Sequence, residues 1–487
     1  MSSGWHALKW NTFGNLVRGL AQFAIGILLA RLLGPTPFGI VALAWMVVGL
    51  GRLFADLGFG AALVQRPTLS QAELRFVFTW QMLFALLLAA GGILGADLLA
   101  RVFHAPQAAP VLRAMFCLFL IECPGNASAA LLRRALDFKT VQQIGIASYL
   151  VGYLLVGIPA AWFGWGAWSL VAAQLTQSLL STALLLRAAP LPLRPLLRCD
   201  TPGLAGFGVK VAAANLSSWT ISNLDIALIG RAFGVASLGL YSRALNLLNM
   251  PMNMVTACFQ GVLFAACSRL QADRARLRRI HLETGTAVAL VCMPVFGAAA
   301  AIPDTLILGI YGPAWAASIP LVTPLALAVL TNALLAIHGP VLMAADRVGT
   351  ELRNQLATIV LFVPALAVAV RYSLAATAWT IFGAYLLRWI LLTRATLRFT
   401  GAGSADYLRS LRLPALAGVA VALVAGAVDR GLAGQPALPR LLCIMFASAA
   451  TVLALAQRFG ALCLKRHLAT LVDVERLAMP LKKFLNA

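Results

Sequence analysis

The sequence predicts an all-α polytopic membrane protein, and three observations lead to that class. Of 487 residues, 61% are hydrophobic and only 11% are charged, whereas a soluble domain carries about 25% charged residues. Apolar stretches of the length that crosses a bilayer, about 20 residues, recur along almost the whole chain. The segments between them are short and leave no room for a separate soluble domain. Helices are expected because a spanning helix satisfies its own backbone hydrogen bonds where water is absent.

About fourteen transmembrane helices are expected. They cover residues 11–32, 40–64, 76–100, 108–130, 141–162, 166–187, 207–230, 237–266, 284–302, 318–344, 354–371, 374–393, 412–429 and 440–457. The first is predicted to be a retained helix, because "RLLGPTPFG" follows it instead of a small-residue cleavage site. Pro124 interrupts the fourth. After the last span, the basic and amphipathic segment 471–487 is either an interfacial helix on the inner leaflet or a loosely ordered tail.

The distribution of basic residues predicts the orientation. The formal net charge is +22, and membrane proteins concentrate Lys and Arg in their cytoplasmic loops. With the N-terminus inside, 27 of the 38 Lys and Arg fall in the even-numbered connections and the two tails or within a few residues of them, and six fall in or at the borders of the odd-numbered connections. The sequence therefore predicts both termini in the cytoplasm, and it explains the positive charge without a nucleic-acid partner.

The reactive residue types do not form a recognisable catalytic or metal-binding pattern. The eight cysteines lie in spans or on the predicted inner side, and no Cys-x-x-Cys is present, so neither disulfides nor a metal site are expected. No nucleophile–base arrangement or acid pair stands out. Of the five histidines, only His338 falls within a predicted span, where a lone polar contact in the core is expected. The chain is predicted to have no cofactor and not to be an enzyme.

Two segments 200 residues apart are similar. "ARLLGPTPFG" at 30–39 is followed by "GRAFGVASLG" at 230–239, so that an arginine and two glycines coincide: Arg31 with Arg231, Gly34 with Gly234, and Gly39 with Gly239. Each segment is expected to be an outer turn in which the first glycine ends one helix and the second lies near the start of the next. At the same offset, polar residues on one face of the preceding helix also correspond: Asn15, Arg18 and Gln22 with Asn215, Ser218 and Ser222.

This offset equals six spans, which predicts two lobes with the same orientation in the membrane. The expected organisation is an N-terminal lobe at 1–190 with spans 1–6 and a C-terminal lobe at 191–398 with spans 7–12. Spans 13 and 14 and a cytoplasmic tail follow at 399–487. The two lobes are expected to surround a central cavity, and the polar faces are expected to line it, because polar residues facing lipid are costly.

Several segments spread over the chain carry a family resemblance. They are "ARLLGPTPFGIVALA" (30–44), "DLGFGAALVQR" (56–66), "NLDIALIGRAFGVASLGLYSRA" (223–244), "SRLQADRARLRR" (268–279) and "YGPAW" (311–315). Together they resemble the polysaccharide transporter branch of the multidrug/oligosaccharidyl-lipid/polysaccharide flippase superfamily. The resemblance implies a multi-pass protein of the bacterial inner membrane. It also implies alternating-access translocation of an undecaprenyl-pyrophosphate-linked oligosaccharide for lipopolysaccharide, O-antigen or exopolysaccharide biosynthesis.

Such a substrate suggests which polar residues form the binding site. Arginine suits a pyrophosphate because its planar fork binds phosphate oxygens in pairs, so the arginines within spans are candidates, although each could instead snorkel or pair internally. Amides suit sugar hydroxyls, although amides also join helices inside a bundle. The substrate-binding candidates are Arg18, Arg52, Arg243, Asn15, Gln22, Asn246, Asn249 and Asn253.

Two acids complete the set of candidates. Asp225 lies deep in the seventh span, where it is expected either to bind a coupling proton or sodium ion or to hold an arginine of the other lobe. Asp56 is four residues after Arg52, so the two are expected to face each other on one helix. That pair would neutralise Arg52 and compete with a role in binding substrate.

Two other functions are compatible with the composition. The first is an ion-coupled drug or cation antiporter of the same superfamily, which needs an ion-binding acid cluster, and the acids here are scattered. The second is a membrane-embedded O-antigen ligase or polymerase, which needs a larger outer loop than any present. For the flippase, the expected partners are the lipid-linked oligosaccharide, membrane lipids, H⁺ or Na⁺, and a polysaccharide polymerase.

Overall fold

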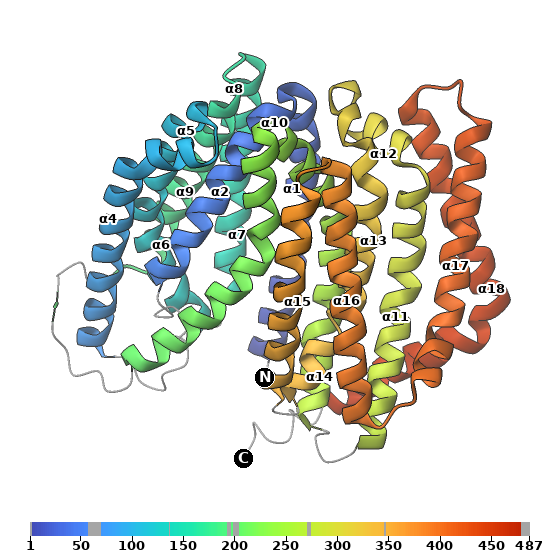
Figure 1. Ribbon diagram of the computed structural model, residues 1–487. Coiled ribbons are helices and arrows are strands. Elements are labelled where there is room, and N and C mark those ends of the chain that lie inside the picture. The colour runs from blue at the N-terminus through green and yellow to red at the C-terminus, as the bar shows by residue number, and fades with distance from the viewer. Residues whose placement is uncertain are drawn as a thin grey trace. The chain divides into compact units, whose positions relative to one another are not determined.

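The structure is a computed structural model that describes the backbone of residues 2–56, 70–135, 137–191, 196–197, 204–269, 274–344 and 347–478. Side chains are described in the same ranges except at 2–13, 54–56, 204–218, 221–222, 257–258, 261–262, 264–266, 268–269, 344, 348 and 458–478. The described chain divides into two compact units, Met1–Ser242 and Arg243–Ala487. Each unit is built from helices, as the sequence predicts (Figure 1).

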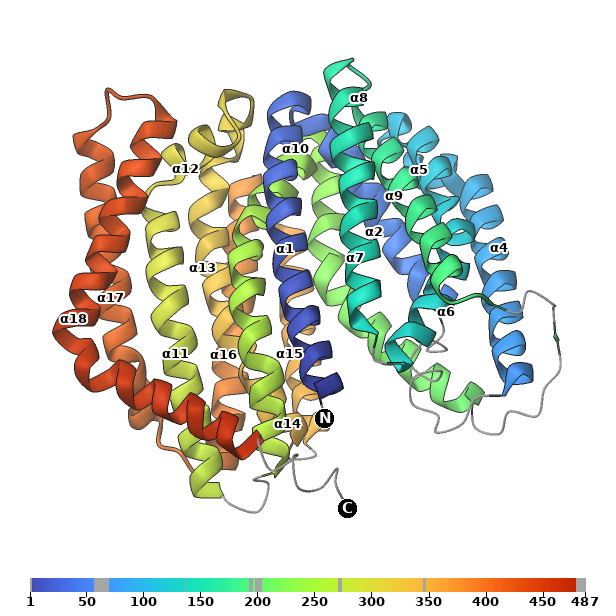
Figure 2. The ribbon, with the colours of Figure 1, turned by 180° about the vertical axis from the view of Figure 1, so that it is seen from behind.

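The first unit is a bundle around helix α9, which contacts α2, α6, α7 and the π-helical segment η2. Figure 2 shows α7, α8 and α9 from behind, with α1 beside α7. The unit contains α1 (Ser2–Leu33), α2 (Pro35–Asp56), α4 (Gln71–Val102), the 3₁₀ turn η1 (Pro106–Ala108), α5 (Ala109–Phe116), α6 (Leu118–Arg134), α7 (Phe138–Tyr149), η2 (Leu150–Gly157), α8 (Ile158–Trp162), α9 (Ala167–Ala188) and the first part of α10 (Leu204–Arg269).

The second unit is organised around α11, which packs against α13 and α17. In turn α16 packs against α13 and α15, and α17 packs against α18. The unit contains the remainder of α10, α11 (Arg274–Ala301), α12 (Pro303–Ile310), the 3₁₀ turn η3 (Pro313–Ser318), α13 (Ile319–Leu335), α14 (His338–Ala344), α15 (Val348–Ala369), α16 (Leu374–Thr400), α17 (Ser404–Gly431) and α18 (Ala437–Ala478). The final helix extends into the C-terminal segment 471–487 as far as residue 478.

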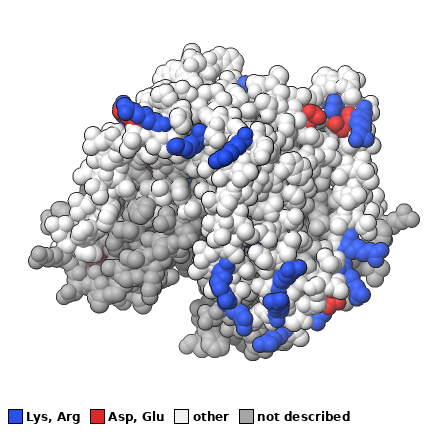
Figure 3. All heavy atoms as spheres, in the orientation of Figure 1, with Lys and Arg blue, Asp and Glu red and all other residues white. Residues whose placement is uncertain are grey.

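The predicted number of membrane spans is confirmed. Thirteen segments of the described chain are long and apolar enough to cross a membrane, and one of them, Asn223–Thr256, runs through the break in α10 at Gly234. Because this break divides α10 into two arms, the thirteen segments provide fourteen transmembrane helices. Over α15 to α18, Figure 3 shows charged side chains toward the two ends and a broad uncharged band between them, as expected for a surface that faces lipid.

Short local signals fix where several helices start and stop. Ser70 and Glu73 form a capping box at the start of α4, in which the Ser70 hydroxyl accepts from the Glu73 amide at 3.1 Å. The Asp137 carboxylate accepts from the amide of Thr140 at 3.1 Å and caps α7. At the end of α16, Gly401 adopts a left-handed conformation with φ +70°. These two polar caps and the left-handed glycine place the helix ends in the short connections that the sequence predicts.

The first glycines of the two repeated turns have similar φ angles. Gly34 and Gly234 have φ values of +72° and +78°, a region that favours glycine, so each ends a helix as predicted. The helices that follow contact each other reciprocally inside the first unit. A Cβ atom on Gly39 would lie 1.6 Å from the Val235 carbonyl oxygen, and one on Gly239 would lie 2.0 Å from the Pro35 carbonyl oxygen. Pro35 and Val235 are themselves 200 residues apart, so the contact follows the sequence repeat and supports it.

This close approach predicts a large effect of a single methyl group. We expect Gly39→Ala to lower the thermal midpoint and the yield of monodisperse protein in detergent, because the two backbones must separate to admit the Cβ atom. Gly19→Ala is the matched control, since nothing lies within 4 Å of that position on α1, and it should be neutral or slightly stabilising. Equal midpoints for the two variants would contradict the reciprocal contact.

The "YGPAW" segment has a structural role in the second unit. Gly312 has φ +91°, which only glycine adopts readily, and it turns the chain between α12 and η3. Trp315 is completely buried, with its ring centroid 5.4 Å from that of Tyr311. The Tyr311 hydroxyl donates to the carbonyl of Arg243 at 3.4 Å. This motif therefore anchors the turn to α10.

Candidate functional site

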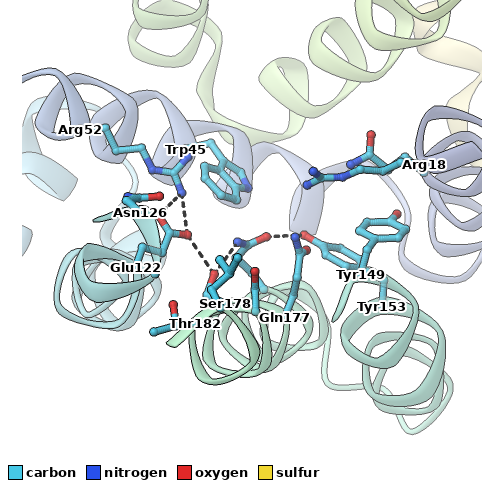
Figure 4. Close-up of a pocket in the computed structure, with 15 residues that line it drawn as sticks. Arg18, Trp45, Arg52, Glu122, Asn126, Tyr149, Tyr153, Gln177, Ser178 and Thr182 are labelled. Carbon is cyan, nitrogen blue, oxygen red and sulfur yellow. Dashed lines mark hydrogen bonds and ion pairs between the residues drawn. The ribbon is translucent and has the colours of Figure 1, made fainter. Parts of the chain in front are cut away.

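A polar pocket of about 490 Å³ lies within the first unit (Figure 4). Helices α1, α2, α6, α7 and α9 and the segment η2 form its walls. Its lining is unusual for a membrane-spanning region, because three charged side chains and a set of amides and hydroxyls converge on it together with three aromatic rings. The lining residues are Arg18, Gln22, Trp45, Arg52, Glu122, Gly125, Asn126, Tyr149, Tyr153, Gln174, Gln177, Ser178, Ser181, Thr182 and Leu185.

An ion pair joins α2 to α6 at one side of the pocket. One terminal nitrogen of Arg52, Nη2, lies 2.9 Å and 2.7 Å from the two carboxylate oxygens of Glu122. The guanidinium also lies over the ring of Trp45, with Cζ 4.7 Å from the ring centroid, a favourable cation–π distance. The Glu122 side chain is 20% exposed and the Arg52 side chain 40%. Arg52 is therefore already neutralised in this conformation.

A chain of hydrogen bonds extends from this pair along α9. The Ser178 hydroxyl donates to Glu122 Oε1 at 2.9 Å, and the Gln174 amide donates to Ser178 Oγ at 3.0 Å. The Tyr153 hydroxyl in turn donates to Gln174 Oε1 at 3.0 Å. Since each step satisfies a buried or half-buried polar group, the chain fixes the rotamers on this side of the pocket.

Arg18 is the second cation of the pocket. In Figure 4 its side chain extends from α1 into the pocket, on the side opposite Arg52. Its Nε is buried without a hydrogen-bond partner, and no carboxylate pairs with it among the residues that the structure describes. Its guanidinium lies against α7 at Gly145, where a Cβ would be in ordinary contact with Arg18 Nη1 at 3.5 Å. A charge with unused donors in a partly buried site is suited to bind an anion.

The structure brings three of the predicted binding residues together in the pocket, namely Arg18, Gln22 and Arg52. Asn15 instead joins α1 to α7, because its side-chain oxygen accepts from Gln142 Nε2 at 3.0 Å. The remaining candidates belong to the second unit, on α10, and do not line this pocket. There Asn246 and Asn253 are exposed and Asn249 is half-buried. Arg243 anchors the "YGPAW" turn through its carbonyl.

Of the two acids predicted as candidates, the structure describes the side chain of one. Asp225 is buried, and its carboxylate accepts from the hydroxyl of Tyr241 and from the amide of Ile226. The tyrosine lies beyond the repeated turn on the second arm of α10, so this bond braces the two arms against each other. The side chain of Asp56 lies outside the described residues, and its pairing with Arg52 stays a prediction.

Sequence reasoning missed Glu122 and the polar face of α9. The signal for α9 is present, because Gln174, Gln177, Ser178, Ser181 and Thr182 follow the three- and four-residue spacing of one helix face. Glu122 is an acid inside the fourth span, two residues before the noted Pro124, and intramembrane acids are rare enough to be singled out.

A second buried polar cluster lies in the second unit. His281 Nε2 is 3.1 Å from His338 Nδ1, and the other nitrogen of His338 is 3.1 Å from the Thr393 hydroxyl. Both histidines are completely buried. His338 is therefore one of a pair, and the expectation of a lone polar contact was wrong because α11 begins early enough to include His281.

The fold defines the class of this protein. The structure resembles that of the "Lipid II flippase MurJ, inward closed conformation", with a TM-score of 0.74 and 11% identity over 94% of this chain and 99% of that one. It also resembles an inward-facing multidrug resistance MATE family transporter of the MOP superfamily, with a TM-score of 0.63 and 14% identity over 79% of this chain and 94% of that one. The fold is thus shared with these two proteins, and the apolar helices make this chain a multi-pass membrane protein.

Sequence comparison narrows the class to a family. Residues 28–320 match the model of the polysaccharide biosynthesis protein family, which is more than half of the chain, and the chain belongs to that family. The resemblance inferred from the five sequence segments is confirmed.

The names of three relatives refer to the biosynthesis of succinoglycan, lipopolysaccharide and teichuronic acid. The succinoglycan biosynthesis transport protein ExoT of Rhizobium meliloti (strain 1021) is 29% identical over 66% of this chain and 65% of its own length. The lipopolysaccharide biosynthesis protein WzxC of Escherichia coli (strain K12) is 23% identical over 74% of each chain. The teichuronic acid biosynthesis protein TuaB of Bacillus subtilis (strain 168) is 24% identical over 86% of this chain and 88% of its own length.

Proposed function

We propose that the protein is a flippase that moves an undecaprenyl-pyrophosphate-linked oligosaccharide across the bacterial inner membrane, for lipopolysaccharide, O-antigen or exopolysaccharide biosynthesis. Family membership and the names of the relatives support a role in polysaccharide export. The observation that carries the proposal is Arg18 in a polar pocket, where it has no carboxylate partner among the residues that the structure describes. A pyrophosphate needs a cation there, because a charged group is costly to move into hydrocarbon.

The pocket accounts for binding and requires no covalent chemistry. Arg18 offers its guanidinium to a phosphate oxygen, and the amides and hydroxyls of α9 offer donors and acceptors to a polar group beside it. Translocation then follows from alternating access, in which a change in the relative placement of the helices exposes the occupied pocket to one side and then to the other. In this proposal H⁺ or Na⁺ supplies the energy, and a polysaccharide polymerase receives the product.

Deletion of the gene in its host provides the direct test. We expect the surface polysaccharide to be lost and its lipid-linked precursor to accumulate on the inner leaflet, and we expect the intact chain to restore export. The ion-coupled drug or cation antiporter predicts a different outcome, namely normal surface polysaccharide with raised sensitivity to cationic drugs. That outcome would contradict the flippase. In the pocket, the pairing of its acid, Glu122, with Arg52 disfavours cation binding.

The same proposal places both termini in the cytoplasm. Reporter fusions after residues 139 and 405 are expected to read as cytoplasmic, and fusions after residues 164 and 312 as periplasmic, because the basic connections lie on the inner side. A periplasmic reading after residue 139 or 405 would reverse the orientation and with it the side on which substrate is loaded.

A further inference from the structure

One wall of the pocket has hydrogen-bonding groups without a partner among the described residues. Asn126 on α6 and Gln177, Ser181 and Thr182 on α9 all line the pocket. In the part of the chain that the structure describes, none of these four side chains has a hydrogen bond to another protein group. Figure 4 shows Asn126, Gln177 and Thr182 along the same side of the pocket as the Glu122–Ser178 bond. We refer to Asn126, Gln177, Ser181 and Thr182 as the amide–hydroxyl wall.

The amide–hydroxyl wall is held in place by its neighbours. Gln174 and Ser178 alternate with the wall residues along α9 and are fixed by their bonds to Tyr153 and Glu122. Helix α6 approaches α9 closely at Gly125, where an added Cβ would lie 2.5 Å from Thr182 Oγ1. A supporting layer of this kind positions the unused groups in advance and lowers the entropic cost of binding a ligand.

The chemistry of the wall indicates a neutral ligand with many hydroxyl groups. An amide both donates and accepts, and so does a hydroxyl, so these four side chains can satisfy a ligand that does the same. They bear no charge, unlike Arg18, Arg52 and Glu122 elsewhere in the pocket. An anion would leave the acceptor oxygens of the wall unused, and an apolar ligand would leave every group unsatisfied.

Aromatic rings complete the site. Tyr149 and Tyr153 lie 4.7 Å apart between ring centroids, nearly parallel at 21°, and both line the pocket. The electron-rich face of an aromatic ring attracts partly positive hydrogens, which a sugar ring presents along its C–H faces. A pocket that combines apolar ring surface with a few convergent polar groups is typical of small-ligand sites.

We propose that the amide–hydroxyl wall, with Tyr149 and Tyr153, is a subsite for the hexose attached directly to the pyrophosphate. This inference rests on the proposed flippase function, because Arg18 in the same pocket then holds the neighbouring phosphate. The protein thereby recognises the first sugar of its cargo as well as the lipid pyrophosphate, and it favours glycosylated carrier over bare carrier.

Binding to the full-length chain in lipid nanodiscs tests the subsite. The probes are bare undecaprenyl pyrophosphate and the same lipid bearing one glucose, galactose or N-acetylglucosamine. We expect at least one glycosylated lipid to bind about tenfold more tightly than bare lipid, the effect of one or two net hydrogen bonds. Gln177→Leu and Thr182→Val should each reduce that preference toward one without changing the affinity for bare lipid. Gln435→Leu, at an exposed amide outside the pocket, is the matched control.

The outcomes separate this inference from the proposed function. If the unaltered chain binds bare lipid but prefers none of the glycosylated lipids, the subsite is wrong and the flippase stands. If the wall variants weaken both kinds of lipid equally, the wall is structural and the subsite is again wrong. Should the unaltered chain bind no lipid at all, the flippase proposal itself fails.

Discussion

Arg18→Ala is expected to lower export of the surface polysaccharide by about 10- to 100-fold while the protein remains in the membrane at a normal level. A hydrogen bond to a charged group contributes about 1.5–3 kcal/mol, and each 1.4 kcal/mol is a factor of ten. Because Arg18 has no carboxylate partner among the described residues, its removal leaves no unpaired charge in the protein, and the fold should tolerate it.

Two companion variants refine this result. Arg18→Lys retains the charge but not the planar fork, so partial export indicates that charge alone suffices, and poor export indicates paired bonds to phosphate. Arg371→Ala, at an exposed position outside the pocket, should export normally. Export is measured as surface polysaccharide, and abundance by immunoblot of the membrane fraction. Normal export by well-expressed Arg18→Ala would contradict a role for this cation.

At Glu122 we expect a loss of stability, in contrast to Arg18, where we expect a loss of export from a folded protein. Replacing one member of a buried ion pair leaves the other charge uncompensated and costs about 3–5 kcal/mol. Here Arg52 is 40% exposed, and solvent screens it, so we expect Glu122→Ala to cost about 2 kcal/mol. The variant also removes the acceptor of Ser178 and breaks the chain of bonds along α9.

A double variant distinguishes the ion pair from simple loss of packing. Arg52→Ala combined with Glu122→Ala should recover part of the lost stability, because no unpaired charge then remains. Glu122→Gln should be intermediate, since it retains a hydrogen-bond acceptor. The measurement is the thermal midpoint of purified protein in detergent. If the effects of the two single variants simply add, the two residues do not interact in the folded protein.

The sequence predicts the spans of this fold well because each span depends on a local run of apolar residues. It also predicts the left-handed glycines of the repeated turns, since a helix end followed by a helix start requires them. Both features depend on residues only a few positions apart, which is the range over which periodicity and capping are informative.

The site is less accessible to such reasoning because its contacts are long-range. Spacing within a helix predicts Asp56 as a partner for Arg52, a pairing that stays a prediction, but it gives no indication of Glu122, which lies 70 residues further along the chain and binds Arg52 in the structure. The packing of the whole unit determines which helices become neighbours, and no local sequence pattern predicts these neighbours. Arg18 was found because a charged residue inside a span is conspicuous on its own.

The reciprocal contact of Gly39 and Gly239 has the form of an isologous dimer interface contained in one polypeptide. Each glycine meets the backbone at the start of the other's helix, as two identical subunits would across a two-fold axis. A true dimer needs a large buried area to hold its subunits together. Here the chain supplies an effective concentration that no dilution can lower. Such a contact does not need the area of a dimer interface, and its two halves can separate and re-form without dissociation of the molecule.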